Sequence, residues 1–209
     1  MRGQAEVIST AILVSVAVVV ALGLIYYLEP QLAASSRDYQ VSSLLSSYAA
    51  SLQVTELSRV NTTGGVVEAF ELSNLGPRPF RVYVGVVPFL NSTGIPVSGG
   101  GGNYTAYVMV NESAVVAPGN TTGWAVLPSV NVSPLSLWIY VGSKYYRISD
   151  LGWNGSVLLY DLGVLNVSKP LVIKVDISDM STDIVYYVSF FARIGNQYYE
   201  VSRVIVYQS

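Results

Sequence analysis

The sequence predicts an α+β protein, in which one long N-terminal helix is followed by an all-β antiparallel sandwich domain (Ig-like). Two observations predict this fold. Residues 7–28 form a run of 22 uncharged, mostly apolar residues. From Val66 onward the hydrophobic period changes from about 3.6 residues to two. The chain has 209 residues, of which 51% are hydrophobic, so it is large enough to bury a core.

The N-terminal segment predicts a helix that can span a membrane. At about 1.5 Å per residue, residues 7–28 reach roughly the 30 Å thickness of a bilayer core. Beyond Pro30, apolar residues recur at helical spacing up to Leu52, with Ser and Gln between them. We therefore expect one helix over residues 4–58, hydrophobic over residues 4–29, bent or loosened near Pro30 and ended by the glycines of residues 61–65.

Residues 66–209 predict the β-domain, because runs rich in Val, Ile, Tyr and Phe alternate with clusters of Gly, Pro, Asn and Ser. No helical pattern lies between these runs, which favours an antiparallel sandwich. Adjacent tyrosines at 145–146, 186–187 and 198–199 are each expected to place one ring on either face of a strand. The nine expected strands lie near residues 66–72, 80–87, 104–110, 136–142, 144–148, 156–161, 171–177, 183–194 and 198–207.

The composition argues against catalysis, metal binding and nucleic-acid binding. The 13 acidic and 11 basic residues are scattered singly, so no basic stripe is available for phosphates. The chain has no Cys and no His, which removes thiol nucleophiles, imidazole bases and the usual zinc ligands. Asp176, Asp179 and Asp183 do not match a calcium loop, and the glycine run at 99–102 lacks the Lys of a phosphate loop. We expect no enzyme activity and no cofactor.

Asn-X-Ser/Thr triplets are the most frequent motif in the chain. With 35 Ser and Thr among 209 residues, chance would place about two such triplets on ten asparagines, yet eight are present. All eight lie beyond the predicted helix. They predict N-linked glycans on an exported surface, where sugars would hydrate a domain in which only 11% of residues are charged. The predicted glycosylation sites are Asn61, Asn91, Asn103, Asn111, Asn120, Asn131, Asn154 and Asn166.

The N-terminus resembles that of archaeal type IV pilins with class III signal peptides, a group that includes adhesion filaments and archaellin-like subunits. The resemblance rests on Arg2, Gly3, Gln4, the nearby Glu6, and about 20 apolar residues that run into an amphipathic helix and a β-domain. The stretch FELSNLGPRPFRVYV also resembles the paired strands of the family's globular heads.

This resemblance implies that a prepilin peptidase cuts between Gly3 and Gln4 and removes residues 1–3 as a leader. It implies that the chain is inserted in the cytoplasmic membrane before assembly. A pilus assembly ATPase and its membrane platform would then build an extracellular filament on the cell surface. The implied partners are therefore other copies of the chain, in a helical homopolymer, and the processing and assembly machinery.

Small residues at four-residue spacing within the apolar segment predict close packing of helices in a filament core; they are Ala11, Ser15, Ala17 and Ala21. The expected function is a structural subunit of an archaeal type IV pilus-like filament for adhesion or surface attachment. One alternative is a membrane-anchored β-sandwich that binds sugars or surface polymers. Another is ordinary secretion with cleavage near residues 32–35.

Overall fold

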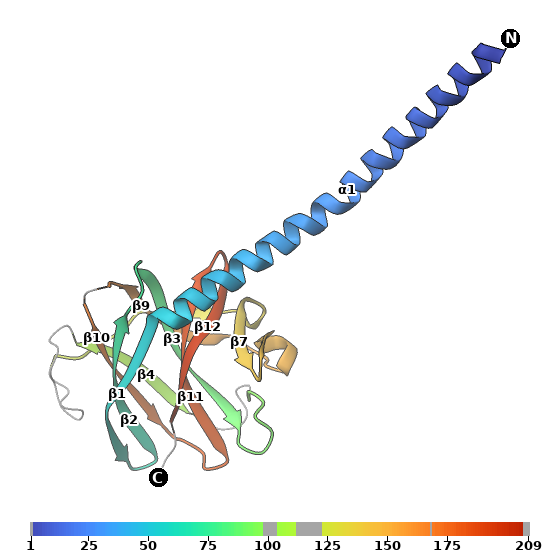
Figure 1. Cartoon of the computed structure of the whole chain (residues 1–209). Coiled ribbons are helices and arrows are strands. Elements are labelled where there is room, and N and C mark those ends of the chain that lie inside the picture. The colour runs from blue at the N-terminus through green and yellow to red at the C-terminus, as the bar shows by residue number, and fades with distance from the viewer. Residues whose placement is uncertain (1, 98–103, 112–122, 168, 207–209) are drawn as a thin grey trace. The chain divides into compact units, whose positions relative to one another are not determined.

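The computed structural model describes residues 2–97, 104–111, 123–167 and 169–206, and side chains from Leu13 onward except that of Asn111. Contacts within the chain divide it into two compact units, Met1–Leu44 and Leu45–Ser209. Figure 1 shows the helix and the strands of these units.

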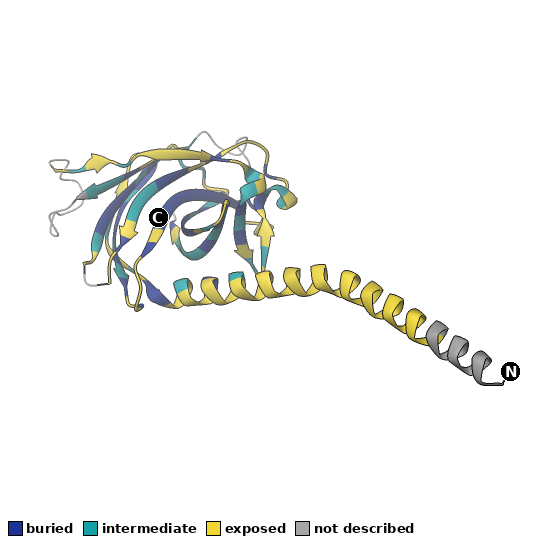
Figure 2. Ribbon diagram, turned by 90° about the horizontal axis from the view of Figure 1, so that it is seen from above, coloured by how far each residue is buried: buried dark blue, intermediate teal, exposed yellow. Residues whose placement is uncertain are grey.

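The first unit consists of helix α1, which as a whole runs from Arg2 to Ser51. The helix continues through Pro30 without interruption, although this residue donates no backbone hydrogen bond. Every described side chain from Leu13 to Gln40 is exposed, as the colouring in Figure 2 shows. The predicted membrane-length apolar helix is therefore present, and within its own unit it buries none of these side chains.

The second unit begins with about the last two turns of α1 and continues as strands joined by turns and two short 3₁₀ helices. The elements are β1 (Leu52–Thr62), β2 (Gly65–Asn74), β3 (Phe80–Leu90), β4 (Thr105–Asn111), β5 (Ala125–Val126), β6 (Ser129–Val132), η1 (Pro134–Ser136), β7 (Leu137–Val141), β8 (Lys144–Arg147), η2 (Ile148–Leu151), β9 (Val157–Leu165), β10 (Leu171–Ser178), β11 (Ile184–Ile194) and β12 (Gln197–Val206).

The strands form two sheets. The five-stranded sheet has the order β1-β2-β10-β4-β5, and the seven-stranded sheet has the order β6-β9-β3-β11-β12-β7-β8. The described strand pairs are antiparallel except for β12 and β7, which run parallel. A long N-terminal helix followed by a two-sheet β-domain confirms the predicted fold class. The order also leaves β1, β5, β6 and β8 as edge strands.

The main core lies between the two sheets. Phe70 and Ile173 from the five-stranded sheet meet Val84, Val188 and Phe190 from the seven-stranded sheet, and all five are fully buried. Phe70 and Phe190 pack edge to face with ring centroids 6.4 Å apart. Alternate residues of β2 and β10 supply this core, as the two-residue period of the sequence predicts.

A second core lies on the other face of the seven-stranded sheet. It contains Val132 of edge strand β6, Phe191 of the central strand β11, and Leu137 and Ile139 of β7. β7 lies near the edge of the sheet opposite to β6. Residues from both ends of one sheet share a core only if the sheet curls, and Figure 2 shows this half-barrel curvature. Ile148 in η2 fills the same core.

The end of α1 is attached to the β-domain through the turn that follows β2. The backbone N–H of Leu75 donates to the carbonyl of Ser51 at 2.8 Å, and Tyr48 stacks on Phe80. A Cβ atom at Gly76 would lie 2.1 Å from the Ser51 Oγ, so this close approach requires glycine. The turn between β2 and β3 therefore holds the helix end.

The predicted helix boundary at residue 58 is wrong. The helix ends at Ser51, and residues 52–62 form β1, whose partners on β2 run from Asn74 opposite Leu52 to Gly65 opposite Thr62. Pairing along the edge of the sheet gives these residues backbone hydrogen bonds that compete with those of a helix. Of the two glycines expected to end the helix, Gly64 lies in the turn between β1 and β2, and Gly65 begins β2. All nine expected strands are present, while β1, β5 and β6 were not predicted.

Candidate functional site

The most extensive candidate surface is the apolar segment of α1. Twelve large hydrophobic side chains between Leu13 and Leu28 are 44–79% exposed. A window of this helix has a mean hydropathy of 2.0 and is long enough to cross a membrane. Because apolar residues surround the helix, it has no polar face with which to meet water. Such a helix is typical of a membrane span or of the interior of a helical assembly.

The small residues of this segment lie on two sides of α1. A helix turns about 100° per residue, so Ala11 and Ser15 lie about 40° apart around the helix axis, as do Ala17 and Ala21, and the two pairs are centred about 120° from each other. Ser15, Ala17 and Ala21 are exposed, and the side chain of Ala11 lies outside the described residues. Two small-residue pairs on different sides can meet two different neighbouring helices, whereas a single seam can meet only one.

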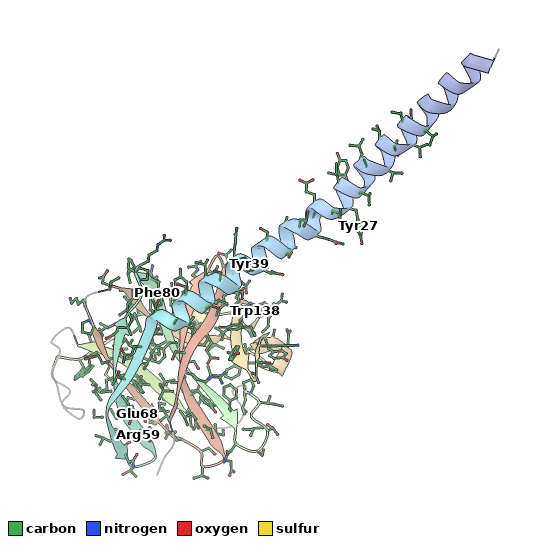
Figure 3. The ribbon with its side chains drawn as sticks, in the orientation of Figure 1. Tyr27, Tyr39, Arg59, Glu68, Phe80 and Trp138 are labelled. Atoms are coloured by element: carbon green, nitrogen blue, oxygen red, sulfur yellow. The ribbon has the colours of Figure 1, made fainter. Side chains whose placement is uncertain are left out.

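Aromatic residues end the apolar segment. Tyr26 and Tyr27 are 79% and 66% exposed, and Figure 3 shows Tyr27 projecting from the helix. The charged residue Glu29 follows directly. Tyrosine near the end of an apolar helix is typical of the boundary between lipid and water.

The predicted processing residues lie in the first turn of α1. Arg2, Gly3 and Gln4 are helical, and their side chains lie outside the described residues. Cleavage between Gly3 and Gln4 therefore stays a prediction.

The described sequon asparagines are all exposed. They are Asn61, Asn91, Asn131, Asn154 and Asn166. Asn61 lies on edge strand β1, and Asn131 lies on edge strand β6. Asn103 and Asn120 lie outside the described residues, and only the backbone of Asn111 is described, at the end of β4. The occupancy of all eight sites stays a prediction.

Asn74, which is not in a sequon, provides an internal comparison. It is 3% exposed, and its amide donates to the carbonyls of Arg78 and Leu165 at 2.9 and 3.0 Å. Its Oδ1 accepts from the N–H of Gly76 at 2.9 Å. This asparagine stabilises the β2–β3 turn, whereas the described sequon asparagines present their side chains to solvent, where an attached sugar has room.

Two buried carboxylates have structural positions in the sheets. Glu68 is 1% exposed and forms an ion pair with Arg59 across β1 and β2; Figure 3 labels both residues. Burial outweighs the attraction of Arg59 and raises the pKa of Glu68 to about 7. Glu200 accepts hydrogen bonds from Ser189 Oγ at 2.7 Å and Tyr140 N at 2.8 Å, so it links three strands. Burial raises the pKa of Glu200 as well.

The acidic cluster does not form a metal site in the part of the chain that the structure describes. Asp176 lies at the end of β10, while Asp179 and Asp183 lie in the turn before β11. No group of three or more potential ligands converges among the described residues. Asp179 adopts a φ of 59° in this turn.

The tyrosine doublets divide between the faces of their strands, as predicted. Tyr186 and Tyr198 are buried, and their neighbours Tyr187 and Tyr199 are partly exposed. Tyr199 stacks on Trp138 with ring centroids 5.7 Å apart, and Arg147 lies over the Trp138 ring. These contacts occupy ring faces with protein atoms, so they stabilise the curled end of the seven-stranded sheet.

A cavity of about 570 Å³ lies between β4 of one sheet and β9 of the other. Tyr104, Tyr107, Trp153 and the sequon residues Asn154 and Ser156 are among its lining residues. No motif in the sequence brings these residues together, and we did not predict this site. The one signal available in the sequence is the tryptophan that directly precedes a sequon.

The fold and the exposed helix define a protein with an apolar N-terminal helix followed by a β-sheet domain, which is a pilin-like architecture. No protein-family model matches the sequence, and no curated protein matches it either. A solved structure described as the complete structure of manganese lipoxygenase of Gaeumannomyces graminis and partial structure of zonadhesin of Komagataella pastoris is similar at 12% identity and a TM-score of 0.36. The match covers 74% of this chain and 45% of that chain. A similarity at this level supports no conclusion about function.

Proposed function

We propose that this protein is a structural subunit of an archaeal type IV pilus-like extracellular filament, which polymerises through α1 and serves adhesion or surface attachment. The observation that carries the proposal is the apolar segment of α1, exposed on all sides. Burial of each large apolar side chain is worth about 1.5–3 kcal/mol. Twelve of them left in water would outweigh the whole stability of an ordinary domain, about 5–15 kcal/mol.

Both lipid and neighbouring helices can bury such a segment, so the choice between them depends on two further features. Residues 7–28 carry no charge, so the segment can leave the bilayer without moving an ion through it. The small residues on two sides of α1 allow close approach of more than one neighbour. A filament core makes use of both features, whereas a permanent single-helix anchor requires neither.

The exposed sequons support an extracellular β-domain. Carbohydrate on Asn61 and Asn131 would cover β1 and β6, two edge strands that could otherwise pair with strands of other molecules. Glycans would also hydrate a surface with few charged residues. In this arrangement the helices form the interior of the filament and the β-domains form its outer surface.

The test is N-terminal sequencing of filaments sheared from cells, combined with electron microscopy of the same sample. We expect fibres whose subunits begin at Gln4. A Val18→Lys variant should remain in the membrane fraction or be degraded, without forming fibres, because a buried charge among packed helices is costly. Tyr39→Lys, beyond the apolar segment on the same helix, is the matched control and should assemble.

Finding only chains that begin at Met1, in membranes and without fibres, would contradict the proposal. That result would favour the alternative of a membrane-anchored β-sandwich that binds sugars or surface polymers. Extraction of the chain as a detergent-solubilised monomer would support the same alternative. Release of a soluble protein that begins near residues 32–35 would instead indicate ordinary secretion.

A further inference from the structure

Charged residues are rare on α1. Between Leu13 and Ser51 the sequence places only Glu29, Arg37 and Asp38 on this helix. All three are exposed, and none of them forms an ion pair with a residue that the structure describes. Glu29 directly follows the apolar segment, so it lies at the boundary of the surface that polymerisation would bury. Arg37 is the one basic residue in this part of the helix.

Glu29 and Arg37 are too far apart to pair within one helix. They lie on the part of α1 between Tyr27 and Tyr39, which Figure 3 labels. Their Cα atoms are about 12 Å apart along the helix axis, whereas pairs within a helix form at a spacing of three or four residues. Around the axis, Arg37 lies about 80° from Glu29, and Asp38 lies on the side opposite to Glu29. Both members of a complementary pair are therefore available to other molecules.

A second copy of α1 offers the complementary charge if the two helices are staggered. In a helical homopolymer neighbouring copies point the same way along the filament, and each contact joins two different sides of the same helix. Two copies in register would place Glu29 beside Glu29, which repulsion between like charges disfavours. A shift of about eight residues, or about 12 Å, instead brings Glu29 of one copy level with Arg37 of the other. The apolar segments still overlap along about 14 residues after this shift.

We propose that Glu29 of one subunit forms an ion pair with Arg37 of a neighbouring subunit whose α1 is shifted by about eight residues, or about 12 Å. This inference rests on the proposed filament function and adds to it the stagger of two subunits and the residues of one contact. Other shifts provide no such pair. A shift of about four residues brings Glu29 level with the uncharged Ala33, and a shift of about nine brings it level with the acid Asp38.

The ion pair acts on assembly rather than on the folding of one chain. An exposed ion pair contributes little in water. Neighbouring helices, however, would exclude water from Glu29 at the end of the apolar segment, and a buried charge without a partner is costly. The same contact recurs at every subunit, so the filament sums its effect. Reversal of one charge should therefore reduce the amount of fibre, whereas membrane insertion depends on the apolar segment and should continue.

The first test reverses these charges in the full chain and measures the fibres sheared from cells. Glu29→Lys should reduce the amount of fibre about tenfold or more, because it places two cations at each contact, and Arg37→Glu should do the same with two acids. The double change Glu29→Lys with Arg37→Glu should restore most of the fibre. Asp38→Lys makes the same change of charge on the side opposite to Glu29, so it is the matched control and should assemble. The amount of chain in membrane fractions shows whether each variant is inserted.

The second test measures the stagger and uses the absence of cysteine from the chain. Intact filaments of a variant with both Glu29→Cys and Arg37→Cys are treated with a short bifunctional thiol reagent. Each subunit carries both thiols, so links continue from subunit to subunit and should give a ladder of multimers on a denaturing gel. Glu29→Cys alone should give dimers at most. Glu29→Cys with Val41→Cys moves the second thiol one turn, about 5.4 Å, beyond Arg37 and should give a much weaker ladder.

The ion pair and the filament function fail in different ways. Absence of fibres from the wild-type chain would contradict the filament function, and the ion pair with it. Normal wild-type fibres, with a double reversal that restores no fibre, would overturn the ion pair alone. Each charge would then meet another group, such as a lipid phosphate or a charge of the β-domain. The ion pair is also overturned if both single reversals assemble normally, or if the two cysteine pairs give equally strong ladders.

Discussion

Tyr48 and Phe80 stack with their ring centroids 4.7 Å apart and their planes 18° from parallel. The contact joins the last turn of α1 to β3, and Phe80 is 6% exposed. Figure 3 labels Phe80 beside that turn. Removal of one ring should therefore loosen the end of the helix and expose the core edge below it.

Tyr48→Ala should reduce the free energy of unfolding of the second unit by about 1–3 kcal/mol, because it removes buried aromatic area and the ring contact. The measurement is denaturant unfolding of the full chain in detergent, followed by near-ultraviolet circular dichroism. Tyr39→Ala is the control, since Tyr39 is 77% exposed on the same helix and should change stability by less than about 0.5 kcal/mol. Equal effects of the two variants would show that the stacking contributes nothing.

Gly76→Ala should destabilise the chain by about 1–3 kcal/mol, because its Cβ would lie 2.1 Å from Ser51 Oγ and 2.7 Å from Ser51 Cβ. Ser51→Gly removes both of these atoms. In a double-mutant cycle measured by thermal unfolding, the second change should therefore recover part of the loss. Strict additivity of the two changes would mean that the clash is relieved elsewhere.

The free energy of unfolding should depend on pH through Glu68. Burial raises the pKa of this residue to about 7. The folded chain binds this proton more tightly than the unfolded chain, so the contribution of Glu68 to stability increases as the pH falls from about 7 to about 4.5. A rise of the pKa from 4.5 to about 7 corresponds to about 3 kcal/mol. Glu68→Gln should therefore reduce the difference in stability between pH 5 and pH 8.

Glu71→Gln, which also replaces one carboxylate of β2 by an amide, is the matched control for this experiment. The comparison stays above pH 5 because Asp161 has the opposite effect in acid. Burial raises the pKa of Asp161, but hydrogen bonds from Arg81 and from the backbone of Gly163 lower it by more. The role given to Glu68 would be contradicted if the wild-type chain became more stable from pH 5 to pH 8 and Glu68→Gln gained the same amount.

Ala17→Leu should prevent or strongly reduce filament formation while membrane insertion continues. Overpacking of a close helix contact costs about 1–3 kcal/mol, and the cost recurs at every subunit. Insertion depends on hydrophobicity, which the change increases. Val18→Leu, at a neighbouring exposed position, is the matched control. The amount of chain in membrane fractions measures insertion, and fibre counts by electron microscopy measure filament formation. Normal fibres from Ala17→Leu would show that Ala17 does not lie on the packing surface.

Mass spectrometry of peptides from the surface protein should find sugar at Asn61, Asn91, Asn131, Asn154 and Asn166, and none at Asn74. The paired change Asn61→Gln with Asn131→Gln removes glycans from two edge strands and should promote aggregation. The paired change Asn91→Gln with Asn154→Gln removes the same number of glycans outside edge strands and serves as the control. If the two double variants aggregated equally, the glycans on Asn61 and Asn131 would have no role in protecting the edge strands.

The sequence predicted those elements whose own pattern decides their structure. The run of uncharged residues determined α1, and alternating apolar residues determined strands such as β2, β10 and β11. The end of the helix was not predictable in this way. Leu52 continues the helical spacing of Leu45 and Tyr48, and neither Gly nor Pro separates the helix from β1. Pairing with β2 decides the structure of this segment, and pairing is a property of the folded sheet.

The short strands and the cavity could not be predicted from the local sequence pattern either. β5 contains only Ala125 and Val126, too few residues to show any period. The residues around the cavity come from β3, β4, β9 and the turn after η2, so only the arrangement of the two sheets brings Trp153 near Tyr104. By contrast, all described sequon asparagines are exposed, because the polar turns and strand edges in which these motifs occur lie at the surface.

The direct connection between α1 and β1 has a mechanical consequence. Ser51 ends the helix and Leu52 begins the strand, with no flexible residue between them. In a filament, tension applied to a β-domain would pass through this single peptide bond into the backbone hydrogen bonds that join β1 to β2. A subunit of this design cannot absorb a pull by extending a linker. Its resistance to stretching is therefore set by the β1–β2 strand pair together with the contacts of Ser51 and Tyr48 with Leu75 and Phe80.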